Sequence, residues 1–146
     1  MSNQTLGLLI GGLLPALCFA MSNVFTKPAT ASGLGLGLYM LIIGLTITLV
    51  GALIYLLQPA ESFNLTGGLY AAGVGFAWAI GAAGIAYALS HYQMTLSRLV
   101  PLFNMNTLLT VLISLWVFAE YKDVNTIKLL AGSALIVAGG TLVLNA

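Results

Sequence analysis

Long apolar runs separated by short polar breaks make up almost the whole chain. Five runs stand out, at about residues 6–25, 33–57, 67–89, 96–119 and 127–144. A helix that crosses the hydrocarbon core of a bilayer needs about 20 mostly apolar residues, and each run is close to that length. The pattern predicts an all-α membrane protein, a bundle of about five transmembrane helices with short loops that forms a single domain over residues 1–146.

The polar breaks predict where these helices end. Lys27-Pro28 is expected to close the first helix, because proline disfavours the helical conformation of the residue before it. The third helix is expected to end near His91 and the fourth at Glu120. Residues 1–5 contain no Lys or Arg, so the first run is interpreted as a retained helix rather than a cleaved signal peptide.

The composition agrees with a membrane protein and excludes several other classes. Only 5% of the residues are charged and 60% are hydrophobic, whereas a soluble domain has about 25% charged residues. The net charge of +1, with no basic stripe, argues against nucleic-acid binding. The sequence contains no evident nucleophile–base pair, metal-ligand cluster or phosphate-binding glycine loop. We therefore expect neither an enzyme nor a bound cofactor or metal.

The basic residues balance across the predicted membrane. With five helices, the loops that carry Lys27 and Arg98 lie on one side, and those that carry Lys122 and Lys128 lie on the other. Lys and Arg in short loops set the orientation of a membrane protein, because they prefer the cytoplasmic side. With two on each side, they do not favour either orientation of this chain. A single fixed topology and dual insertion both stay open. Two copies in opposite orientations would form an inverted repeat, as in many secondary transporters.

Small residues form stripes on the predicted helices. Gly37, Gly44 and Gly51 recur every seven residues in the second helix, and Gly132 and Gly139 have the same spacing in the fifth. In lipid, helices associate closely where small residues allow their backbones to approach. The stripes predict tight helix contacts, either within one chain or between two.

Neutral polar residues are the candidates for a binding site, because ionisable residues are nearly absent from the runs. Asn23 lies toward the end of the first helix. In the fourth, Asn104 and Thr107 lie three apart on one face, while Asn106 and Thr110 lie on nearly the opposite face. One face is expected to hydrogen-bond a neighbouring helix and the other to line a cavity. The alternative is that all of these side chains only tie helices together.

Aromatic side chains offer a second type of candidate. Trp78 and Tyr87 lie in the third helix, which is otherwise rich in Gly and Ala. Large rings beside small neighbours can form the wall of an apolar pocket with polar tips. The alternative for Tyr87 is a place in the aromatic belt at the membrane interface. Tyr39 and Tyr55 bracket the second helix as members of such a belt would.

Two prolines lie inside predicted helices. Pro15 follows Gly11-Gly12 in the first, and Pro101 stands near the start of the fourth. Each lacks the N–H that would bond the carbonyl four residues earlier, so each helix is expected to bend there. The bends are either hinges of a transport cycle or passive kinks, since proline is common in membrane helices.

The stretch from Tyr87 to Asn145 resembles the second part of an EamA-type domain of the drug/metabolite transporter superfamily. The third helix ends rich in Ala and Tyr and leads into a polar turn, and the fourth contains Pro101 and ends in the acidic Glu120. A last helix of Gly-x-x-Leu-Ile-x-x-Gly type follows a short charged loop. The opening helix, with Asn23 and Lys27, is also similar, whereas the second lacks the Arg that members often carry near its start.

Family members contain two such five-helix units of opposite orientation, so the resemblance implies a half-size transporter that pairs with a second chain. It also implies a central cavity lined by the first, third and fourth helices. The candidate substrate-binding residues on these helices are Asn23, Trp78, Tyr87, Asn104 and Thr107. In the related small multidrug resistance proteins the last helix forms the dimer contact, which would give that role to Gly132 and Gly139. Those proteins rely on a carboxylate in the first helix, which this chain lacks.

The resulting hypothesis is a transporter of a small neutral or zwitterionic metabolite that works by alternating access. It would act as a homodimer of half-transporters, parallel or antiparallel, in a bacterial inner membrane, with Pro15 and Pro101 as hinges. Its partners would be the solute, the lipid bilayer and a second copy, without nucleic acid, cofactor or metal. The alternative is a non-transporting membrane subunit or assembly factor of a larger complex.

Overall fold

The computed structural model describes residues 3–58, 63–122 and 124–144. The regular secondary structure in these ranges is entirely helical. Five stretches are long and apolar enough to cross a membrane, namely Thr5–Ala31, Leu36–Leu57, Leu65–His91, Leu96–Val117 and Thr126–Val143. The predicted all-α fold with five membrane spans is confirmed, and the chain is an integral membrane protein.

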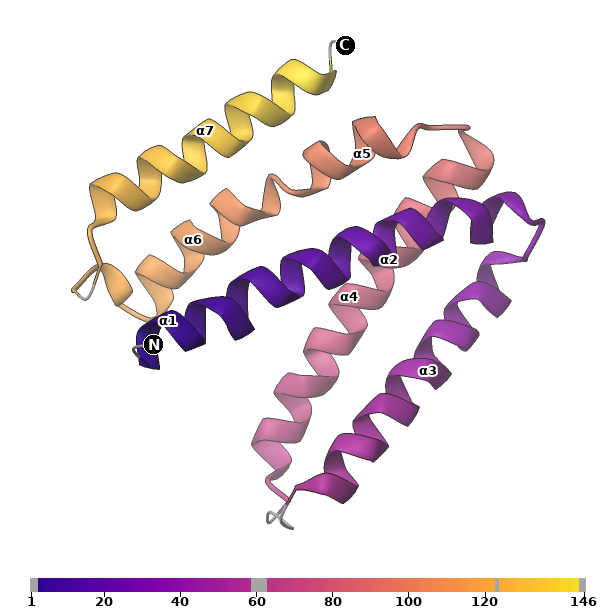
Figure 1. Ribbon diagram of the computed structural model, residues 1–146, viewed down its shortest axis with the longest axis horizontal. Helices are drawn as coiled ribbons and strands as arrows, with labels where there is room; N and C mark the ends of the chain where they lie inside the picture. The colour runs from indigo at the N-terminus through magenta and orange to yellow at the C-terminus, as the bar shows by residue number, and fades with distance from the viewer. Residues whose placement is uncertain (1–2, 59–62, 123, 145–146) are drawn as a thin grey trace. The chain divides into compact units, whose positions relative to one another are not determined.

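The chain divides into two compact units, of which the first extends to Gln93. The helices of this unit are α1 (Asn3–Leu8), η1 (Leu9–Leu13), α2 (Leu14–Ala31), α3 (Leu36–Leu57) and α4 (Leu65–His91). The first three follow one another as one span, and α2, α3 and α4 contact one another (Figure 1). On each of these three helices, the inner face is the side that contacts the other two.

The second unit begins at Met94. Its helices are α5 (Leu96–Phe103), α6 (Asn106–Val117), η2 (Glu120–Lys122) and α7 (Thr126–Leu144). Both α5 and α6 pack against α7, so the second unit is a hairpin with an interrupted first arm (Figure 1).

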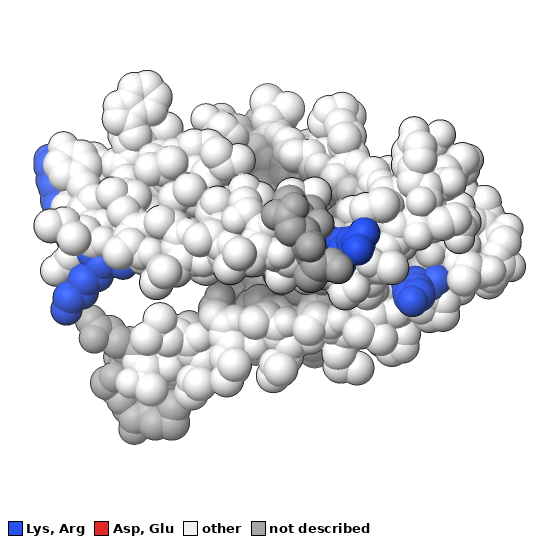
Figure 2. All heavy atoms as spheres, turned by 90° about the horizontal axis from the view of Figure 1, so that it is seen from above, with Lys and Arg blue, Asp and Glu red and all other residues white. Residues whose placement is uncertain are grey.

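Few side chains are buried among the described residues. The buried ones are Tyr39, Ala86, Leu89, Leu115 and Ser133. Large apolar side chains such as Leu56 and Trp116 are 78% and 85% exposed. Figure 2 shows Lys and Arg as separate patches among uncharged residues on the face in view. This surface suits lipid as the solvent, because hydrocarbon does not require a charged exterior.

The first span is longer than the sequence predicted. Lys27-Pro28 does not close it, and α2 continues to Ala31. Membrane helices tolerate proline, and α2 passes through Pro28 although this residue has no N–H for the Val24 carbonyl. The Thr30 hydroxyl donates to the Thr26 carbonyl at 3.0 Å and to the Lys27 carbonyl at 3.1 Å. The span ends instead before Gly33, whose φ of +80° suits a glycine that terminates a helix.

The distortion expected near Pro15 takes the form of a π-helical turn. Residues Leu9–Leu13 adopt this conformation, and the Leu14 N–H donates to the Leu9 carbonyl, five residues back. Pro15 lies in the first turn of α2, directly after this π-helical turn, so the irregularity accompanies the proline. The irregularity contains Gly11-Gly12 and lies inside the first membrane span.

Tyr39 has a different role from the one the sequence suggested. It is only 8% exposed, and its hydroxyl donates to Thr26 Oγ1 at 3.2 Å, which joins α3 to α2. The prediction of a place in the interfacial aromatic belt is therefore wrong for Tyr39, because a partner in the preceding helix satisfies its hydroxyl. Tyr55, at the other end of α3, is 68% exposed.

The predicted fourth helix, residues 96–119, is not continuous. It separates into α5 and α6 at Asn104 and Met105. The Met105 N–H donates to the Leu102 carbonyl at 3.2 Å rather than to the carbonyl of Pro101 four residues back. The Thr107 N–H likewise donates three residues back, to Asn104, at 3.0 Å. The break follows Pro101 by about one turn, so the bend expected at this proline takes the form of an interruption at Asn104 and Met105.

Candidate functional site

The α5–α6 break brings two of the predicted site residues together. The bond from the Thr107 N–H to the Asn104 carbonyl closes a tight turn, in which side chains three apart lie above one another. Asn104 is exposed and Thr107 is half-buried. Within the described part of the chain, neither side chain forms a hydrogen bond. Since an unpaired amide in hydrocarbon is costly, Asn104 requires a polar partner from outside its own unit's helices.

The break lies well inside the membrane span. The helix before it, α5, has 8 residues and the helix after it, α6, has 12. At about 1.5 Å per residue, Asn104 lies about 12 Å along the helix from the start of a span of 22 residues. The break therefore presents polar groups at a depth where ordinary membrane helices have none.

Asn23 lies in the first unit, on the inner side of α2. It is three residues from Thr26, which accepts the Tyr39 hydrogen bond, and so shares a face with it. Its side chain is half-buried and, among the described residues, makes no hydrogen bond. Asn23 is thus a second unpaired amide inside a membrane span.

Trp78 and Tyr87 lie on the same helix but not on the same face. They are nine residues apart in the continuous helix α4, and at 3.6 residues per turn this spacing places them on opposite sides. They are 44% and 40% exposed, respectively. A single cavity beside α4 can therefore contact only one of the two rings of a given chain.

Tyr87 belongs to an aromatic cluster at the C-terminal end of α4. Its ring stacks on the His91 ring, with centroids 4.1 Å apart and planes 20° apart, and the ring of Tyr92 approaches it edge-on at 5.8 Å. Sequence reasoning treated Tyr87 and His91 separately. Their four-residue spacing is the signal that could have found the stack, because such residues are neighbours on a helix.

Ser90 and His91 are close, but their geometry does not activate the serine. Ser90 Oγ lies 3.1 Å from His91 Nδ1, yet it donates its hydrogen to the Ala86 carbonyl at 2.9 Å. The hydroxyl can then only accept a hydrogen bond from the imidazole. Ser90 and His91 thus lie in the last turn of α4, where the serine hydroxyl bonds a backbone carbonyl, and they do not have the geometry of a nucleophile and its base. Among the described residues, no three His, Cys, Asp or Glu side chains lie together as metal ligands do.

The last helix, α7, has two different small-residue faces. Gly140 is buried, and a Cβ atom there would lie 3.0 Å from the Pro101 carbonyl oxygen, so α5 and α7 meet backbone to backbone. Gly132 and Gly139 are exposed, and a Cβ atom on either would meet nothing within 4 Å. Sequence reasoning found the outer stripe and missed Gly140, although the adjacent pair Gly139-Gly140 was visible.

The five predicted substrate-binding residues thus fall into two groups, Asn23, Trp78 and Tyr87 in the first unit and Asn104 and Thr107 in the second. No family model, curated protein or solved structure matches this chain. Function is therefore inferred from the membrane spans, the break in the fourth of them and the unpaired amides.

Proposed function

We propose that this chain is a half-transporter that moves a small neutral or zwitterionic metabolite across the membrane by alternating access, as a homodimer. The observation that carries the proposal is the α5–α6 break, with the unpaired side chains of Asn104 and Thr107 inside the fourth span. Many secondary transporters bind their substrates near the middle of the bilayer, at helices that are interrupted there, and here the fourth span tightens to i→i+3 bonds at Asn104 and Met105. Asn23 and Trp78 are the proposed binding residues of the first unit.

The break also supports the type of substrate. Backbone hydrogen bonds bridge the break, so its polar groups are mainly side chains. Asn104 and Thr107 add uncharged donors and acceptors between them. Such a site suits a solute that carries both an amine and a carboxylate, or neutral polar groups. No ionised side chain is required.

The dimer follows from the number of spans and their charges. In a chain of five spans with two basic residues on each side, the basic residues do not favour one orientation over the other, which supports dual insertion. Two opposed copies would provide the inverted repeat found in many transporters. The outer stripe of α7, Gly132 and Gly139, is the proposed contact, and the π-helical turn before Pro15 and the break after Pro101 are the proposed hinges. By the EamA resemblance, we propose a bacterial inner membrane.

Purification in a mild detergent tests the assembly. We expect a homodimer with twice the protein mass of the 15.2 kDa chain, and a monomer for Gly139→Leu, because the leucine would hold the two α7 helices apart. Light scattering with a correction for detergent measures both. A wild-type monomer, or a stable complex with other chains, would contradict the proposal. The second result would favour a non-transporting subunit.

A further inference from the structure

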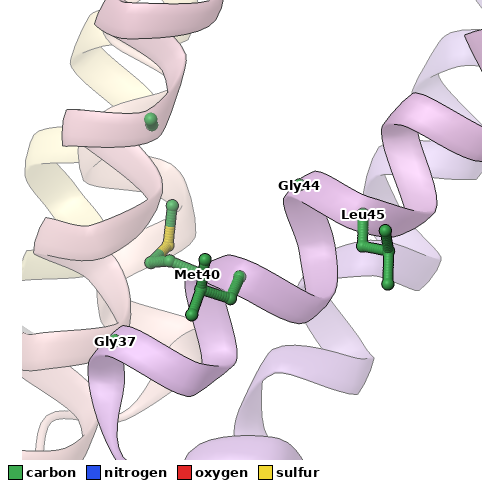
Figure 3. A pocket seen from close by; sticks show the side chains of 6 residues that line it. Gly37, Met40, Gly44 and Leu45 are labelled. Atoms are coloured by element: carbon green, nitrogen blue, oxygen red, sulfur yellow. The ribbon is translucent and has the colours of Figure 1, made fainter.

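An apolar groove lies between α3 and α4 of the first unit. Its volume is about 600 Å³, and its lining residues are Gly37, Met40, Leu41, Gly44, Leu45 and Ala79. Figure 3 shows four of them along successive turns of α3. Five of the six follow the spacing of a single helix face, and Ala79 is the contribution of α4. The groove therefore runs along α3, from near its first residue toward the middle of the span.

The walls of the groove define what can occupy it. No polar side chain lines it, and a Cβ atom at Gly37 or Gly44 would meet nothing within 4 Å. The occupant must be apolar, since nothing in the groove would pair its polar groups. The groove is open to the surface, so an occupant can enter it from the side. A flexible hydrocarbon chain can follow it along α3.

A basic residue stands at the end of the groove nearest the membrane surface. The 3.2 Å bond from the Tyr39 hydroxyl to Thr26 Oγ1 fixes the end of α2 beside the start of α3. Lys27 directly follows Thr26, and Met40, which lines the groove, directly follows Tyr39. Lys27 is exposed and forms no ion pair with any described residue. An apolar groove that ends at a free cation complements an anionic amphiphile.

We propose that this groove holds one acyl chain of an anionic phospholipid, whose phosphate pairs with Lys27. The lipid would fill the space between α3 and α4 and would connect the first unit to the headgroup layer. This assignment does not depend on the transport proposal. A chain that transports nothing would still have the same groove and the same lysine.

Photo-crosslinking in lipid nanodiscs tests the assignment. The probe is phosphatidylglycerol with a diazirine in its acyl chain, and mass spectrometry maps the labelled residues. We expect labels on the groove residues, above all Met40 and Leu41. Unlabelled phosphatidylglycerol should compete about fivefold better than phosphatidylcholine, because one lysine near an anionic surface contributes that much to binding. Labels elsewhere along the spans with none in the groove, or equal competition by the two lipids, would overturn it.

Matched variants separate the groove from the rest of α3. Gly44→Leu should fill the groove and abolish its labelling, while Gly51→Leu, in the same stripe but outside the groove, should leave labelling unchanged. Lys27→Gln should remove the preference for phosphatidylglycerol, and Lys128→Gln should preserve it. Unchanged labelling of Gly44→Leu, or an equal loss in Gly51→Leu, would contradict the proposal. Crosslinks from Met40 to a second copy of the chain would assign the groove to the dimer instead.

Discussion

Replacement of Gly140 by leucine is expected to destabilise the second unit severely. Its Cβ atom alone would lie 3.0 Å from the Pro101 carbonyl oxygen and 3.6 Å from Met105 Cγ. The obstructing oxygen belongs to the backbone of α5, so it cannot move aside as the end of a flexible side chain would. Overpacking costs about 1–3 kcal/mol of the free energy of unfolding, and leucine should reach the upper end. We expect the melting temperature of the purified protein to fall by roughly 10–20 °C.

Gly139→Leu is the matched control, because it places the same side chain one residue earlier in the same helix. A Cβ atom at Gly139 meets nothing within 4 Å, so this variant should keep its fold even if its dimer is lost. Thermal unfolding in detergent and limited proteolysis of the 94–146 segment distinguish the two effects. Equal stability of the Gly140 and Gly139 variants would show that α5 and α7 do not meet backbone to backbone.

Asn104→Ala is expected to abolish transport without unfolding the protein. The Asn104 side chain makes no hydrogen bond with any described residue, so its removal breaks no contact within the chain. The substrate, in contrast, would lose its partner at the break, a loss of about 1–3 kcal/mol that weakens binding roughly 5- to 150-fold. Trp78→Ala should have the same effect by removing the aromatic wall of the first unit.

A thermal-shift screen against metabolites first identifies the solute, because a ligand that binds only the folded state must stabilise it. Uptake of that solute into proteoliposomes then compares each variant with a control of the same chemistry. Asn106→Ala removes a neighbouring exposed amide, and Trp116→Ala removes a ring that is 85% exposed. Both controls should transport normally. Normal uptake by Asn104→Ala and Trp78→Ala together would reject the site.

The membrane spans could be predicted because their length is a property of the bilayer rather than of the fold. Each span needs about 20 apolar residues whatever it packs against, and five such runs are visible in the sequence. The end of the first span was harder to predict from the sequence. Proline disfavours the helical conformation of the residue before it, but membrane helices tolerate it, and the span continues through Pro28 to Ala31.

Features that depend on another helix were missed for a common reason. Gly140 matters because Pro101 lies opposite it, and Tyr39 is buried because Thr26 faces it. Neither partner is adjacent in the sequence, so no local pattern identifies the pair. The opposite placement of Trp78 and Tyr87, in contrast, follows from their spacing alone. Whether Asn104 and Thr107 line a cavity stays a prediction, although their unpaired side chains at the break favour it.

The orientation of the chain in the membrane tests the inverted half-transporter most directly. With Cys18 replaced by serine, a single cysteine added after Ala146 can be labelled by a membrane-impermeant reagent in right-side-out and in inside-out vesicles. We predict comparable labelling of both preparations. Asn125→Lys, which adds a base to the loop after the fourth span, should make the C-terminus accessible only from outside. If the protein that keeps Asn125 is labelled at its C-terminus in only one of the two vesicle preparations, the inverted pair is contradicted.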